Sequence, residues 1–116
     1  MLTQDMIFMD FGIISKEKNK SLFSGRQNGC EYAQDYNLTS FDNKPLLHFI
    51  VPENIVIAGS FYLGLLEKYF QLFTNKEECY KYITYNGEYY EKNKVPELEK
   101  GMERAFRLNA PYYYLK

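Results

Sequence analysis

The stretch from Leu46 to Phe73, LLHFIVPENIVIAGSFYLGLLEKYFQLF, decides the fold of this chain. Its first six residues form an apolar run that ends at Pro52, and such a run predicts a strand buried on both faces. The part that begins at Phe61 has apolar residues at helical spacing, namely Tyr62, Leu66, Tyr69, Phe70 and Phe73. We expect this part to be a largely buried helix at the centre of the core.

The residues before this stretch predict a strand followed by a helix. Residues 5–14, DMIFMDFGII, are rich in Ile and Phe and indicate an N-terminal strand or hairpin, and the charged residues 16–20 indicate an exposed loop. Ser24 and Gln27 fit a capping box, so a helix is expected to start there and to end near Asn37. A glycine inside that helix, at position 29, costs about 1 kcal/mol relative to alanine unless close packing explains it.

The residues after it predict one more strand and one more helix. Residues 79–86, CYKYITYN, are typical of a strand closed by a turn, although a helix continuing from Asn75 is the alternative. The last helix begins at Pro96, and its apolar face consists of Leu98, Met102, Ala105 and Phe106. The order strand and helix, repeated three times, predicts an α/β fold in which helices pack on a small mixed sheet.

Length and charge narrow the class of protein. The chain has 116 residues, which predicts a single domain over residues 1–116 with a tail at 109–116. Fourteen Lys and Arg against fifteen Asp and Glu leave a net charge of −1, which argues against nucleic-acid binding. No apolar segment approaches the roughly 20 residues of a membrane span, and no signal peptide is apparent. We therefore expect a cytoplasmic protein that binds neither nucleic acid nor membrane.

The supply of metal ligands and nucleophiles is small. Cys30, Cys79 and the single histidine, His48, are too few for a disulfide scaffold or a four-ligand zinc site, so we expect no metal and no cofactor. The alternative is a nucleophilic pair of one cysteine with His48. Both cysteines fall on predicted apolar faces, however, and no third group is placed to orient such a pair. We therefore expect that the chain is not an enzyme.

Aromatic residues are abundant and concentrated late in the chain. Twelve Tyr and nine Phe make up 18% of the residues, and ten of the tyrosines lie at or beyond Tyr62. A small domain buries only about 60% of the surface of its unfolded chain, so some tyrosines are expected to face outward. Three consecutive ones, Tyr112, Tyr113 and Tyr114, follow Pro111 and form either a tail docked on the domain or an exposed patch.

Two short segments, together with the order of elements, resemble the STAS-like family of small bacterial domains, which are relatives of anti-sigma-factor antagonists. Residues 24–29, SGRQNG, are similar to the Ser-Arg-x-x-Gly-like segment that opens the first helix in that family. Residues 50–61, IVPENIVIAGSF, are similar to its buried strand, short turn and Ser-Phe pair. The resemblance extends over roughly residues 5 to 108 and implies a STAS-like fold.

The resemblance also implies a function. It implies a non-enzymatic regulatory domain that binds a protein partner, such as a kinase-like ATPase, and that has Ser60 as a site of phosphorylation. The partner-binding residues would be Ser24, Arg26, Ser60, Phe61 and Tyr62, with the aromatic surface extended by Tyr112, Tyr113 and Tyr114. The chain departs from the antagonists at Ala58, because they have an acidic residue two positions before the phosphorylated serine.

Other interpretations stay open at this stage. Ser60 has a purely structural interpretation as a helix N-cap, which contributes about 1 kcal/mol, and Arg26 has one as a solvated helix residue. A function of a different class is that of a phage-type inhibitor or decoy, which would bind a host effector through its Tyr-rich C-terminal half. The sequence leaves open whether the origin is bacterial or phage, and whether the chain forms a homo-oligomer.

Overall fold

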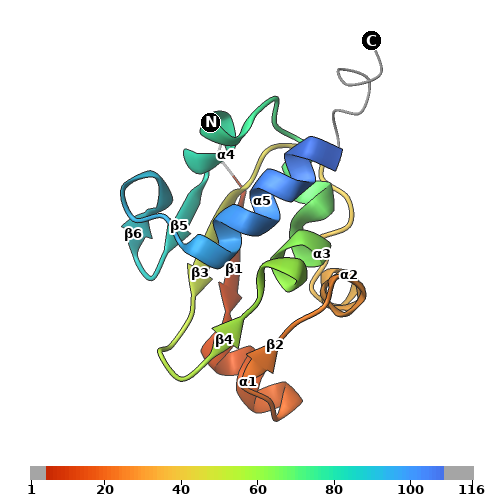
Figure 1. Cartoon of the computed structure of the whole chain (residues 1–116), viewed down its shortest axis with the longest axis vertical. Coiled ribbons are helices and arrows are strands. Elements are labelled where there is room, and N and C mark those ends of the chain that lie inside the picture. Colours follow the sequence, from red (N-terminus) through yellow and green to blue (C-terminus); the bar gives the residue numbers. More distant parts are fainter. Residues whose placement is uncertain (1–4, 109–116) are drawn as a thin grey trace.

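A four-stranded mixed sheet with helices on one of its faces organises the chain, and the computed structural model describes residues 5–108 (Figure 1). Strands β1 (Met6–Asp10), β3 (Leu46–Ile50) and β5 (Ile83–Tyr85) are parallel, and β6 (Glu88–Tyr89) pairs antiparallel with β5. The strand order is β1-β3-β5-β6. The prediction of an α/β fold, a small mixed sheet packed by helices, is confirmed.

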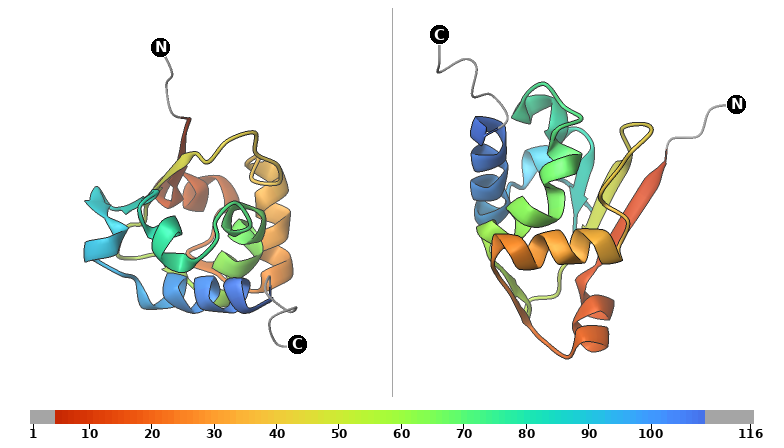
Figure 2. Two further views of the ribbon diagram at one scale, coloured as in Figure 1. Left: turned by 90° about the horizontal axis from the view of Figure 1, so that it is seen from above. Right: turned by 90° about the vertical axis from the view of Figure 1, so that its right-hand side faces the viewer.

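The remaining elements connect or cover this sheet. Strands β2 (Leu22–Phe23) and β4 (Val56–Ile57) form a separate two-stranded parallel sheet. The helices are α1 (Phe11–Lys18), α2 (Arg26–Asp35), α3 (Gly59–Phe70), α4 (Lys76–Tyr80) and α5 (Pro96–Leu108), with a 3-10 helix, η1 (Tyr90–Lys92). Figure 2 shows α2, α3 and α5 on the same side of the four-stranded sheet.

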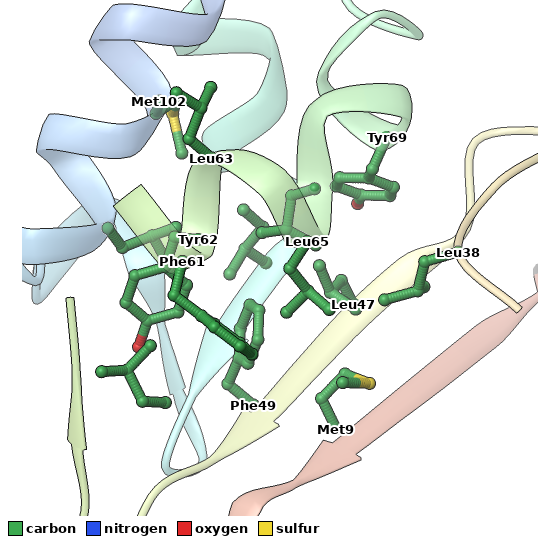
Figure 3. Close-up of a cluster of buried hydrophobic side chains, with 14 of the residues drawn as sticks. Met9, Leu38, Leu47, Phe49, Phe61, Tyr62, Leu63, Leu65, Tyr69 and Met102 are labelled. Atoms are coloured by element: carbon green, nitrogen blue, oxygen red, sulfur yellow. The ribbon is translucent and has the colours of Figure 1, made fainter. Parts of the chain in front are cut away.

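Helix α3 lies at the centre of the core, as its sequence predicts. It begins at Gly59 and ends at Phe70, three residues earlier than expected, and every residue from Phe61 to Leu66 is buried. Its side chains point toward Leu47 and Phe49 of β3, while Leu63 lies near Met102 of α5 (Figure 3). This one helix therefore contacts both the sheet and the neighbouring helix, which explains its nearly continuous apolar sequence.

The prediction for the N-terminal segment is wrong in its second half. Residues 11–18 form α1, not a strand followed by a loop, because Asp10 caps this helix. Its Oδ1 atom accepts hydrogen bonds from the backbone N–H groups of Gly12 at 2.9 Å and Ile13 at 3.2 Å. The helix ends at Asn19, which adopts a left-handed conformation with a φ of 53°. The apolar pattern of this segment is compatible with a strand or a helix, and the capping by Asp10 and Asn19 favours the helix.

Three other predictions need correction in detail. The residue that precedes α2 is Gly25, which makes no side-chain cap, so the expected capping box of Ser24 and Gln27 is absent. Among residues 5–108, strand β3 is covered on one face only, since His48 is half-buried and Ile50 is exposed. Residues 79–86 contain both of the predicted alternatives, a helix at their start and a strand after it. Helix α4 extends to Tyr80, and strand β5 begins at Ile83.

Candidate partner-binding site

Ser60 joins the starts of two helices. It is the second residue of α3, and its Oγ atom accepts a hydrogen bond of 3.1 Å from the backbone N–H of Gly25. Gly25 directly precedes α2 and has a φ of 91°, a conformation that favours glycine. Ser60 is therefore not the N-cap of its own helix, a position that Ala58 occupies. Its hydroxyl holds the loop before α2 against the first turn of α3.

Two of the other predicted site residues lie beside Ser60 on the surface. Ser24 and Arg26 flank Gly25, and both are exposed. The Arg26 guanidinium forms an ion pair of 3.3 Å with Glu67 of α3, which holds the side chain across the two helices. We call Ser24, Arg26 and Ser60 the Ser60 surface, and the structure brings these three predicted residues together.

A hollow of about 230 Å³ adjoins Ser60 between the starts of α3 and α5. The carboxylate of Glu97 accepts a hydrogen bond of 2.9 Å from the backbone N–H of Gly59 and one of 3.1 Å from the Lys100 ammonium. The backbone hydrogen bond, followed by the one from Lys100, lowers the pKa of Glu97. Lys100 and Arg104 also line the hollow, so two cations lie there together with the Glu97 carboxylate, to which Lys100 is paired.

Phe61 and Tyr62 were predicted to contact a partner, but the structure places both inside the core. Their exposed fractions are 0% and 1%. The Phe61 ring packs edge-on against the rings of Phe23 and Tyr32, and the hydroxyl groups of Tyr62 and Tyr85 share a hydrogen bond of 2.8 Å. Because α3 is enclosed by the sheet and two helices, its first turn has no aromatic side chain left for the surface. These two residues are therefore removed from the candidate site.

Up to residue 108, most tyrosines of the C-terminal half are buried or half-buried. Tyr69, Tyr80 and Tyr90 are buried, whereas Tyr89 of β6 is 68% exposed. The hydroxyl groups of Tyr80 and Tyr90 both donate to Glu99 of α5, at 2.8 and 2.9 Å. This carboxylate explains how two tyrosines are accommodated in a small core, and no sequence motif marked it. The tail residues Tyr112, Tyr113 and Tyr114 lie outside the described residues.

The two cysteines and the histidine do not assemble into a nucleophilic pair. Burial, together with a hydrogen bond of 2.8 Å to the Glu67 carboxylate, raises the pKa of Cys30 to about 11. Burial also raises the pKa of Cys79, which is fully enclosed. His48 alternates along β3 with the buried Leu47 and Phe49, so it lies on the opposite face of the sheet from these two residues. There its Nδ1 atom and the Thr84 hydroxyl form a hydrogen bond of 2.6 Å. Both thiols are therefore held in the neutral form, which is the weaker nucleophile.

Among residues 5–108, no group of three or more His, Cys, Asp or Glu side chains is arranged to hold a metal ion. Across the same residues, no helix combines the length and apolar character needed to cross a membrane. Comparison with protein-family models, curated proteins and solved structures finds no match. The resemblance to STAS-like domains therefore rests on the two short sequence segments and the order of elements.

Proposed function

We propose that this chain is a non-enzymatic regulatory domain that binds a protein partner through the Ser60 surface. The observation that carries the proposal is the hydrogen bond from Gly25 to Ser60, because it brings the two segments of the STAS-like resemblance together at one exposed place. Ser24 and Arg26 are exposed there, and Ser60 is half-buried, so all three are open to contact from outside.

The same position suits control by phosphorylation. A phosphate on Ser60 would bring roughly two negative charges at neutral pH, next to the cations of Lys100 and Arg104 at the hollow. It would also disturb the hydrogen bond that the Ser60 hydroxyl accepts from Gly25. Modification would therefore change both the charge and the shape of the Ser60 surface. We propose this as the switch that a kinase-like ATPase would operate.

The inhibitor or decoy function has narrower support. It depends on exposed tyrosines in the C-terminal half, and within residues 5–108 this half exposes Tyr89 alone to a large extent. Removal of residues 110–116 tests the contribution of Tyr112, Tyr113 and Tyr114. If the shortened chain stays folded and loses its partner while Arg26→Glu retains it, the inhibitor interpretation replaces the Ser60 surface.

Affinity capture from the native host tests the proposal directly. Arg26→Glu reverses a charge on the Ser60 surface, and Lys81→Glu makes the same charge change at an exposed residue just after α4. We expect Arg26→Glu to lose the partner that the unmodified chain and Lys81→Glu both retain. Equal capture by the two variants would contradict a partner site at the Ser60 surface.

Mass measurement of the intact chain tests the switch separately. After incubation with the captured ATPase and ATP, we expect a mass increase of one phosphate that Ser60→Ala lacks. The circular dichroism of Ser60→Ala serves as the control for folding, because the substitution also removes the hydrogen bond from Gly25. An increase that persists in Ser60→Ala would place the modification at another residue.

A further inference from the structure

The face of the four-stranded sheet opposite to the helices carries an unbroken row of side chains. The strand register aligns Phe8 of β1 with His48 of β3, His48 with Thr84 of β5, and Thr84 with Tyr89 of β6. The Phe8 and His48 rings are stacked with their centres 4.8 Å apart. Because successive side chains of a strand alternate between the two faces, Met6, Leu46 and Ile50 belong to this same face. We call these seven residues the outer face.

The outer face is apolar and exposed. Met6, Phe8, Ile50 and Tyr89 are 58, 64, 42 and 68% exposed, respectively. None of the seven residues carries a formal charge with His48 neutral, and the adjoining carboxylate of Asp10 is occupied by the N–H groups of α1. Parallel sheets are normally covered on both faces, and here Figure 2 shows the large helices on one side only.

We propose that the outer face is a homodimer interface, covered by the same face of a second copy of this chain. With about 150–250 Å² for each aromatic side chain and a similar or smaller area for Met6 and Ile50, the four exposed side chains present on the order of 500 Å². Two such faces, fully covered, would together bury about 1,000 Å², and the half-buried Leu46, His48 and Thr84 add to this area. A total of about 1,000 Å² is the least that a specific interface buries, so the area is sufficient for a small dimer interface.

The lack of charge on the outer face favours a second copy over a charged partner. A neutral face offers no group that would select or steer a charged partner, whereas two identical neutral faces meet without repulsion. Symmetric dimers use the same patch on both subunits, and their interfaces are richer in apolar and aromatic residues than other protein surfaces.

Light scattering coupled to size-exclusion chromatography tests the proposal. We expect the full chain to elute at twice its mass of 13.8 kDa over a range of concentrations. Phe8→Glu places a charge at the centre of β1 on the outer face and should weaken association at least about tenfold, as for a central interface residue. Tyr89→Asp, at the other end of the row, should also weaken association.

Leu22→Glu is the matched control. Leu22 is 57% exposed on the separate sheet of β2 and β4, so the substitution places the same charge at a similarly exposed strand position. We expect this variant to remain dimeric, and circular dichroism should show that all variants stay folded. A monomeric wild-type chain, or dissociation by Leu22→Glu but not by Phe8→Glu, would overturn the proposal. These outcomes are independent of the Ser60 surface, because the two surfaces lie on different elements.

Discussion

At the scale of single residues, glycines determine how closely α3 approaches its neighbours. A β-carbon at Gly29 would collide with the backbone carbonyl oxygen of Phe61, and one at Gly64 would collide with that of Arg26. The backbones of α2 and α3 are therefore in direct contact. The sequence shows the unfavourable glycine in α2 but not its reason, since the other glycine lies 35 residues further along the chain.

We expect Gly64→Ala to destabilise the protein by about 1 to 3 kcal/mol or more, because the added methyl group forces two helix backbones apart. Urea unfolding followed by circular dichroism measures this loss. Gly12→Ala is the control, since a β-carbon there would meet only side-chain atoms of Asp10 and Pro52. An equal loss for both variants would show that the contact between α2 and α3 is not what position 64 requires.

The carboxylate of Glu97 makes the stability of the folded chain depend on pH. The pKa of Glu97 is lowered by the hydrogen bond from Gly59 and by Lys100, so its ionised form stabilises the folded state. This contribution is complete above the pKa of an unfolded glutamate, about 4.3, and disappears as the pH falls through the lower folded value. We expect Glu97→Gln to lower the melting temperature at pH 7, and the difference from the wild type to be smaller at pH 3, below the pKa of an unfolded glutamate.

The control for this prediction is Glu91→Gln, a carboxylate that is exposed in η1. It should leave the melting temperature nearly unchanged at both pH values, because surface charges without a defined partner contribute little. A gap between Glu97→Gln and the wild type that is as large at pH 3 as at pH 7 would mean that the side chain stabilises by packing and not by its charge.

At the scale of elements, α1 shows where the sequence is ambiguous. Residues 5–14 alternate poorly and contain two Asp and one Gly, so the same letters suit a strand, a hairpin or a strand followed by a helix. The choice depends on one side chain, Asp10, which ends β1 and caps α1. By contrast, α3 and α5 were predicted well because long amphipathic or apolar patterns leave few alternatives.

We expect Asp10→Ala to reduce the stability by about 0.5 to 2 kcal/mol, the usual range for loss of an N-cap. Asp10→Asn should recover most of this loss, because an amide oxygen can accept the same hydrogen bonds from Gly12 and Ile13. Thermal melts of the two variants check this. If Asn and Ala are equally destabilising, the negative charge of Asp10 matters more than its capping geometry.

At the scale of the whole molecule, the sequence predicts that helices pack on a sheet, but not which faces of the sheet they cover. The apolar run from Leu46 to Val51 indicates a central strand, but it cannot reveal that only one of its faces is covered. The candidate site shows the same limit. Ser24, Arg26 and Ser60 lie close together at the surface, whereas Phe61 and Tyr62 are buried, because a local motif does not specify the direction in which each helix residue faces.

The stability of the whole molecule depends on the core around α3. Leu66 is fully buried in α3, the helix that packs against α2 and α5 and faces the sheet, so Leu66→Ala should leave a cavity and cost about 2 to 5 kcal/mol. Leu72→Ala, at a half-buried position just beyond α3, removes the same atoms and should cost less. Urea unfolding should remain one cooperative transition with an unchanged slope for both variants. A loss below about 1 kcal/mol for Leu66→Ala would place that side chain near the surface and would contradict a core built around α3.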